Sequence, residues 1–209
     1  MSEQPEQPVR PDPRLTIVLL AVAVEGGLIF AALLLGWVLG HPPLGTLFWD
    51  LRDAALGVAA TVPMLAVFFA CLRWPVGPLR RIKGLTDDVI RPLLGPCTLL
   101  DLAGISVLAG LGEEMLFRGV LQNAFWDWTG SPWLGLLIAS VLFGLAHSVT
   151  LAYAVFATAM GAYLGWLWQA SGNLLLVAVA HGLYDFVALV VVVRGPAPSG
   201  GSRPPLAGI

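Results

Sequence analysis

Charged residues are scarce in this chain: Asp, Glu, Lys and Arg make up 11% of its 209 residues. Soluble globular domains carry about 25% charged residues. Hydrophobic residues make up 57% of the chain, and the mean hydropathy is +0.83. The shortage of charge excludes an ordinary soluble domain and places the chain among integral membrane proteins.

Basic runs and paired cysteines are also lacking. The net charge is -2, and no Lys/Arg run of the kind that binds nucleic acid occurs, which excludes that class of partner. The two cysteines, Cys71 and Cys97, lie near the ends of apolar segments and form no Cys-x-x-Cys pair. We therefore expect two small apolar side chains and no disulfide framework.

Long hydrophobic runs, in contrast, are abundant. A helix needs about 20 apolar residues to cross the hydrocarbon core, and no segment alternates with period 2 as a membrane barrel requires. The first run is too long for a signal peptide and lacks a small-residue cleavage pattern. The sequence predicts an all-α, polytopic membrane helix bundle of about six transmembrane helices. The expected spans are Leu15–Leu39, Ala54–Leu72, Thr98–Asn123, Trp133–His147, Leu151–Gln169 and Asn173–Val193.

Positive charge gathers on one side of this topology. Most of it lies in the segment 73–96 and in the two tails, whereas the loops on the other side hold only Arg52 among lysines and arginines. The positive-inside rule places both tails, residues 1–14 and 194–209, in the cytoplasm, and we expect both to be disordered. The mixed segment Leu85–Leu94 predicts an interfacial helix. The composition suits a bacterial inner membrane.

Two features within the spans each allow two interpretations. Glu25 is a lone acid in the first span. We expect a polar contact to another helix or a misplaced span end, with a residue of the site or substrate path as the alternative. Gly161 and Gly165 form a G-x-x-x-G pattern, which favours close packing inside the bundle over a dimer face.

Glu113, Glu114 and Arg118 form a first ionisable cluster within the apolar spans. Charge in a bilayer costs about 2.5–3.5 kcal/mol per residue on insertion scales, so it usually has a function. Residues four apart share a helix face, so Glu114 pairs with Arg118, while Glu113 points about 100° away from Glu114. A carboxylate without a cationic partner in such a site can act as a general base near neutral pH. One buried salt-bridge network of all three is the alternative.

Two more clusters lie on later spans. His147 ends the stretch Phe143-Gly-Leu-Ala-His and could equally be a packing or interface residue. His181 and Asp185 are four apart, so the carboxylate can accept from the imidazole and set its tautomer, or form a simple helix-face hydrogen bond. Three clusters on three separate spans indicate one polar site inside the bundle.

The order Glu-Glu-x-x-x-Arg, Phe-x-x-x-His and His-x-x-x-Asp resembles the CPBP family. This family comprises the type II CAAX prenyl endopeptidases and the bacteriocin-processing or Abi proteins of bacteria. The resemblance covers residues 99–193, the expected protease core of a bundle over residues 15–193. The last motif position, Asp185 here, is Asn in many members and generally in the prenyl-processing ones. The motif matches are Glu113, Glu114, Arg118, Phe143, His147, His181 and Asp185.

The resemblance implies an intramembrane endopeptidase that opens toward the cytosol and cleaves membrane-associated or lipidated proteins near their C-terminus. It also implies that Glu113 is the activating base. We expect Glu113, with His147, to take a proton from water. His181 and Asp185 would then polarise the scissile carbonyl and stabilise the oxyanion. Glu114 and Arg118 would hold the first motif in register, or Arg118 would meet a substrate carboxylate.

Activation of water by a bound metal ion is the alternative mechanism for the expected protease. Glu113, His147 and His181 have the residue types of a catalytic zinc site. The chain has no H-E-x-x-H motif, so we expect no metal or other cofactor. The expected partners are the bilayer and a membrane-anchored protein or peptide substrate.

Three other functions stay open. They are a C-terminal sorting or maturation peptidase for non-prenylated substrates, a non-catalytic scaffold or regulator of the Abi type, and a small proton-relaying transporter. Retention of every motif position disfavours the scaffold, and the absence of an inverted repeat or paired broken spans in the sequence disfavours the transporter.

The expected depths of two site residues differ. Glu113 lies about 14 residues, or roughly 21 Å, from the cytoplasmic start of its span. His147 lies near the cytoplasmic end of its own span. Tilt, or a third span that begins after Thr98, would bring the two side chains together.

Overall fold

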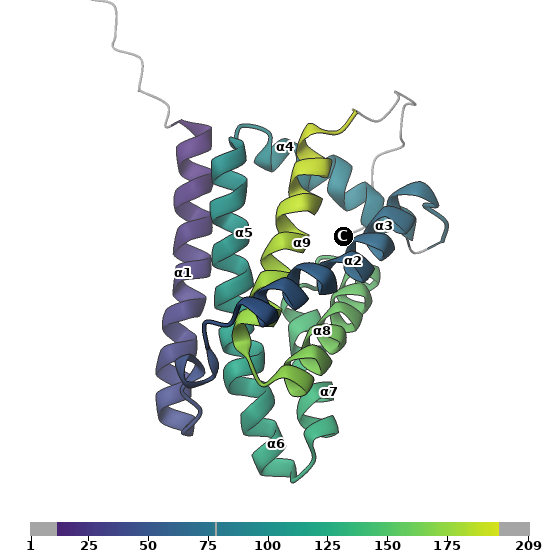
Figure 1. The fold of residues 1–209 in the computed structure, drawn as a ribbon. Helices are drawn as coiled ribbons and strands as arrows, with labels where there is room; N and C mark the ends of the chain where they lie inside the picture. The colour runs from purple at the N-terminus through teal and green to yellow at the C-terminus, as the bar shows by residue number, and fades with distance from the viewer. Residues whose placement is uncertain (1–11, 78, 197–209) are drawn as a thin grey trace, which may run out of the picture.

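The chain folds into the bundle of helices shown in Figure 1. This computed structural model describes residues 12–77 and 79–196, and within them the regular structure is helical with no strand. The predicted all-α bundle is confirmed. η1 is a 3₁₀ turn, whereas η2 and η3 are π-helical. The elements are α1 (Pro13–Leu39), η1 (Pro43–Thr46), α2 (Leu51–Arg73), α3 (Leu79–Leu85), η2 (Thr86–Ile90), α4 (Arg91–Leu94), α5 (Leu99–Glu114), η3 (Met115–Gln122), α6 (Asn123–Thr129), α7 (Pro132–Ala146), α8 (Leu151–Ser171) and α9 (Leu174–Arg194).

The long helices begin and end at capping residues in the sequence. A polar side chain before each of these helices accepts a hydrogen bond from a backbone N–H of its first turn, which satisfies a donor that has no partner within the helix. These caps are Asp12, Asp50, Thr98, Ser131, Thr150 and Asn173. Except for the third, the expected spans match α1, α2, α7, α8 and α9 to within three residues at either end.

The helices identify an integral membrane protein. Within the described ranges, α1, α2, α8 and α9 are each long and apolar enough to cross a membrane. The helical stretches 79–94 and 99–129, which meet at 116°, pass as a fifth span when they are counted together. The sequence thus overstated the number of full-length spans. The expected interfacial segment is helical, and its position relative to a bilayer stays a prediction.

α5 and α9 cross with their backbones in contact. A Cβ atom on Gly110 of α5 would lie 2.6 Å from the backbone nitrogen of Gly182 in α9, so glycine is required for this approach. Gly182 follows His181, and Gly110 precedes Glu114 by about one helical turn. The crossing therefore sets His181 against the glutamates at the end of α5.

α7 is too short to cross the bilayer, and this shortness places His147. Its 15 residues span roughly 22 Å, against a hydrocarbon core of about 30 Å. His147 caps its C-terminus at the depth of Glu113, with 3.6 Å between Nε2 and Oε2. The third span begins at Leu99, directly after its Thr98 cap, so the idea of a later start was wrong. The two side chains therefore meet despite the difference in depth expected from the sequence.

The start of α1 and the end of α9 lie at the same end of the bundle, which is uppermost in Figure 1. Arg14 of α1 forms an ion pair with Asp101 in the first turn of α5, with 2.6 Å between Nε and Oδ2. Arg194, the last residue of α9, donates hydrogen bonds to the carbonyls of Gly95 and Cys97 just before α5. These contacts hold the start of α1 and the end of α9 beside the start of α5.

The predicted disordered tails lie mostly outside the described residues. Pro13 and Arg14 begin α1 and Arg194 ends α9, so these three tail residues are helical. Cys71 and Cys97 are buried and free, as the sequence predicted.

Candidate active site

The two glutamates lie where the helix changes its geometry. Glu113 and Glu114 end α5, and the chain continues directly into the π-helix η3. π-helical turns are rare and occur frequently at functional sites. No residue pattern in Met115–Gln122 signalled this change. The side chains of Arg118 and Gln122, both in η3, donate hydrogen bonds to backbone carbonyls of α8.

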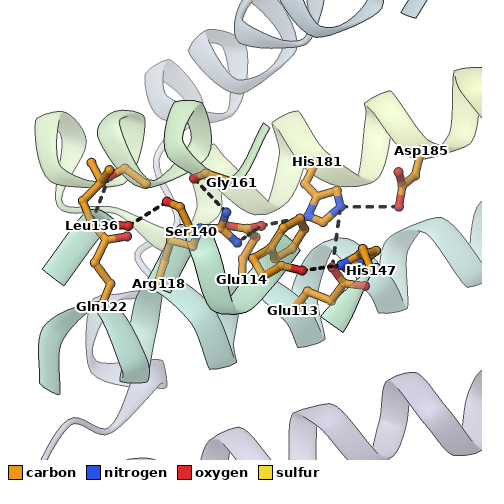
Figure 2. Close-up of polar contacts among 12 residues, drawn as sticks. Glu113, Glu114, Arg118, Gln122, Leu136, Ser140, His147, Gly161, His181 and Asp185 are labelled. Carbon is orange, nitrogen blue, oxygen red and sulfur yellow. Dashed lines mark hydrogen bonds and ion pairs between the residues drawn. The ribbon is translucent and has the colours of Figure 1, made fainter. Parts of the chain in front are cut away.

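Glu114 and Arg118 form the predicted pair. Arg118 Nη1 donates to Glu114 Oε1 over 2.9 Å, and the two side chains are 1% and 0% exposed. The second guanidinium nitrogen donates to the carbonyl of Gly161, 3.0 Å away, and the guanidinium carbon lies 4.7 Å from the centre of the Phe143 ring. Arg118 is thus enclosed on all sides (Figure 2). This favours the role of holding the motif over that of meeting a substrate carboxylate.

The G-x-x-x-G glycines accept hydrogen bonds inside the bundle. The Gln122 side-chain amide donates to the Gly165 carbonyl over 3.1 Å, one turn along α8 from the contact between Arg118 and Gly161. A Cβ on Gly165 would lie 2.7 Å from Gln122 Oε1. Packing within the bundle, as the sequence favoured, is therefore the role of this pattern. The role of Gln122 was missed, because a glutamine in this segment carries no sequence signal.

Glu113 points away from Arg118 and toward two histidines, as Figure 2 shows. Its Oε2 lies 3.6 Å from His147 Nε2 and 4.0 Å from His181 Nε2. This oxygen is buried and accepts no hydrogen bond from the described residues. His147 donates its Nδ1–H to the Phe143 carbonyl over 2.8 Å, which directs Nε2 to the glutamate. The expected separation of the two glutamate faces is confirmed.

His181 joins the two glutamates to the third motif. Its Nδ1 donates to Glu114 Oε1 over 2.8 Å, and its Nε2 lies 3.5 Å from Asp185 Oδ2. Sequence spacing paired His181 with Asp185 only. The shorter contact with Glu114 links residues 67 apart in the chain, so a pattern within one helix could not reveal it. Glu114 therefore holds the Nδ1–H of His181.

A cavity of about 90 Å³ opens beside these residues between α2, α7, α8 and α9. His147, His181 and Asp185 form its polar wall. Most of the other lining residues are apolar or aromatic. They are Met64, Phe143, Tyr153, Phe156, Ala157, Met160, Leu164 and Tyr184. The six site residues predicted from the sequence thus come together, and three of them face a space that a reacting group could enter.

The fit to a metal is incomplete. Three zinc ligands at about 2.0–2.2 Å from a tetrahedral centre would lie about 3.4 Å from one another. Glu113 Oε2 and His181 Nε2 are 4.0 Å apart, and no group of three or more His, Cys, Asp or Glu among the described residues is spaced to hold a metal ion. The two histidines are nevertheless held through Nδ1, as metal-binding histidines usually are. The absence of a cofactor stays a prediction.

Glu25 lies beside the site, and no described residue donates a hydrogen bond to its carboxylate. It lies in the middle of α1, so it does not mark a span end, and its buried Oε2 accepts no hydrogen bond from the described residues. The expected polar contact to another helix was therefore wrong. The Glu25 carbonyl packs next to Gly112, and the Glu25 carboxylate interacts electrostatically with Glu113 and Asp185. It is an additional acid near the site.

Known proteins resemble the part of the chain that builds this site. The model of the family described as type II CAAX prenyl endopeptidase Rce1-like matches residues 95–187, which contain every motif residue. YpbD, an uncharacterised protein of Bacillus subtilis (strain 168), is 30% identical over 142 residues, which make up 66% of this chain and 70% of YpbD. The chain belongs to the Rce1-like family.

Other matches are shorter. An uncharacterised 24.3 kDa protein of Escherichia coli is 50% identical over 56 residues, 25% of each chain. No solved structure matches at a significant level. Membership in the Rce1-like family makes the chain an intramembrane protease at the level of the family. As the resemblance predicted, α1 and α2 lie outside the matched region.

Proposed function

We propose that the chain is an intramembrane endopeptidase that cleaves membrane-associated or lipidated proteins near their C-terminus, with water activated by Glu113. One observation carries this proposal. Glu113 Oε2 is buried, accepts no hydrogen bond from the described residues and faces Nε2 of both His147 and His181. A carboxylate with a free lone pair in a water-poor site suits a general base.

The proposed reaction begins with a water molecule bound between Glu113 and His147. Glu113 takes a proton from the water as its oxygen bonds to the carbonyl carbon of the scissile peptide. The carbonyl oxygen becomes an oxyanion, which His181 stabilises through Nε2–H as an imidazolium whose Nδ1–H is held by Glu114. The C–N bond then breaks, and Glu113 returns the proton to the leaving amine. Water is consumed, and a new carboxyl group and a new amine are formed.

Glu114, Arg118 and Asp185 have supporting parts in this scheme. Glu114 holds the Nδ1–H of His181, and Arg118 fixes Glu114 in turn. Asp185 Oδ2 lies 3.5 Å from Nε2 on the other side of the ring. Carboxylates at both ring nitrogens keep His181 oriented as a donor toward the cavity.

The test in cells compares the C-termini of membrane proteins between strains that express wild-type protein or Glu113→Gln at equal amounts. We expect a small set of membrane proteins to keep longer C-termini in the Glu113→Gln strain. Identical C-termini in both strains would contradict the protease proposal and favour a scaffold or regulator.

Asp185 favours a second form of this activity, because prenyl-processing members generally carry Asn at that position. A peptidase for non-prenylated C-termini would need no lipid on its substrate. The test uses two peptides that end in Cys-Val-Val-Met, one S-farnesylated and one not. Equal cleavage of both by the purified protein favours the non-prenylated class, whereas cleavage of the farnesylated peptide alone favours prenyl processing.

We further propose that both chain ends face the cytoplasm of a bacterial inner membrane. The start of α1, the end of α9 and the start of α5 lie together, next to the basic segment 73–96. A green fluorescent protein fused to the C-terminus should therefore fluoresce in cells. Activity of alkaline phosphatase fused at the same position would contradict this orientation.

A further inference from the structure

The site described so far offers a reacting carbonyl few hydrogen-bond donors. His147 and His181 each use Nδ1–H on a protein acceptor, Phe143 and Glu114 respectively. Asp185 is an acceptor when ionised. With Glu113 and His147 engaged by water, His181 Nε2 is the single donor left for the oxyanion. Enzymes that stabilise an oxyanion commonly aim more than one donor at it.

Tyr153 brings a phenol group into the same cavity. The residue lines the cavity together with His147, His181 and Asp185. Its ring centre lies 6.2 Å from that of His147, at 62°, and its other neighbour is the Phe156 ring at 6.4 Å. Tyrosine hydroxyls in protein interiors usually have a hydrogen-bond partner. The Tyr153 hydroxyl has no hydrogen-bond partner among the described residues, and it is not one of the fully buried polar atoms. It is therefore free to donate to a ligand in the cavity.

The backbone holds Tyr153 firmly at this place. It lies in the first turn of α8, where its N–H donates to the Thr150 side chain over 3.1 Å. Only a short connection separates His147 from this turn. The Tyr153 side chain also interacts electrostatically with Asp185 and Glu113, so it lies on the charged side of the cavity. A group fixed in this way stabilises a transition state without reorganising.

We propose that the Tyr153 hydroxyl is a second hydrogen-bond donor to the oxyanion, acting together with His181 Nε2. This inference rests on the proposed protease function. The phenol keeps its proton throughout, because it donates a hydrogen bond and transfers no atom. Sequence motifs gave no sign of this role, since the residue lies between the second and third motifs.

Tyr163 provides a matched control in the same helix. It also belongs to α8, but it does not line the cavity. Its hydroxyl donates instead to the carbonyl of Ala60 in α2 over 3.1 Å. The substitutions Tyr153→Phe and Tyr163→Phe remove the same atom from one helix, the first inside the cavity and the second outside it.

The experiment uses the full chain reconstituted in phosphatidylethanolamine and phosphatidylglycerol vesicles. The probes are the two Cys-Val-Val-Met peptides and a phosphonate analogue of whichever peptide is cleaved, which mimics the tetrahedral intermediate. For Tyr153→Phe we expect kcat to fall by about 10²–10³-fold with KM little changed. Affinity for the phosphonate should fall by a similar factor, since such analogues report transition-state binding. Tyr163→Phe should match wild type in both measurements.

Three results would overturn the role of Tyr153: an unchanged kcat, a rise in KM alone, or unchanged phosphonate affinity in a Tyr153→Phe protein whose unfolding temperature is normal. Equal losses in Tyr163→Phe would also do so, because they would indicate a general effect of removing a tyrosine hydroxyl from α8. If the wild type cleaves peptide, Glu113→Gln does not, and Tyr153→Phe is fully active, only this inference fails. Wild-type protein that cleaves neither peptide would overturn the proposed function and this inference together.

Discussion

Glu114 Oε1 lies 2.8 Å from His181 Nδ1 and, at the same time, 2.9 Å from the guanidinium of Arg118. One carboxylate oxygen thus joins α5, the π-helix η3 and α9. Its neighbour Glu113 has no such partner and faces the imidazoles. The two adjacent glutamates therefore have different roles. Arg118 and His181 donate hydrogen bonds to Glu114, whereas Glu113 Oε2 accepts none from the described residues.

Glu114→Gln should destabilise the protein. The change leaves Arg118, which is 1% exposed, buried without a charged partner and weakens the bond to His181. Loss of one partner of a buried ion pair costs about 3–5 kcal/mol. Thermal unfolding in detergent should show a clear fall in the unfolding temperature. Glu113→Gln is the control and should unfold near wild type, so equal falls in both variants would contradict the division of tasks.

Gly110→Ala should separate α5 from α9 and impair both folding and activity. The added methyl would lie 2.6 Å from the Gly182 nitrogen, and the helices can avoid this clash only by moving His181 away from the glutamates. Gly104→Ala is the control in the same helix, since a Cβ there meets nothing within 4 Å. It should be neutral or stabilise by up to about 1 kcal/mol through helix propensity. Similar unfolding temperatures for the two variants would show that the crossing tolerates a side chain.

The two histidines should respond differently to substitution by glutamine. His147 caps α7, and its side chain is 26% exposed, so His147→Gln should reduce cleavage by about 10²-fold or more while folding persists. His181 is 7% exposed and bonded to buried Glu114, so His181→Gln should lower both cleavage and unfolding temperature. Unfolding temperatures measured beside peptide cleavage separate the two cases. A larger loss of stability in His147→Gln would reverse these assignments.

Sequence reasoning succeeded where a feature depends on residues close together in the chain. The pair Glu114–Arg118 follows from a spacing of four, and the apolar runs predict the ends of α1, α2, α7, α8 and α9 to within three residues. The divergence of Glu113 from Glu114 likewise follows from helical geometry. These features are local, so the pattern alone contains them.

The features that sequence reasoning missed depend on contacts between helices. The bond between His181 and Glu114 exists because α5 and α9 cross at two glycines, and no single-helix pattern encodes a crossing. The π-helix after Glu114 is stabilised by tertiary contacts of Arg118 and Gln122 with α8. Tyr153 lines the cavity together with residues of α2, α7 and α9, which only the packing of these helices brings together. Span counting included α7 because its residues are apolar, although the helix is shorter than a full crossing.

Removal of metal should leave cleavage intact. Glu113 Oε2 and His181 Nε2 are more widely spaced than zinc ligands would be, and each site residue has a role without a cation. Purified protein should keep its peptidase activity after exhaustive chelation, and elemental analysis should find no stoichiometric zinc. Loss of activity on chelation, restored by zinc at about one ion per chain, would reassign Glu113, His147 and His181 as ligands of a metal-activated water.

The most direct test of the central claim is the cleavage rate of purified Glu113→Gln in lipid vesicles. It is measured beside wild type with the same peptide and the same amount of folded protein. Because the amide cannot take a proton from water, the rate should fall by at least about 10²–10⁴-fold. The unfolding temperature should stay near that of wild type, since Glu113 Oε2 bonds to no described residue. Wild-type cleavage by Glu113→Gln would contradict the assignment of Glu113 as the base that activates water.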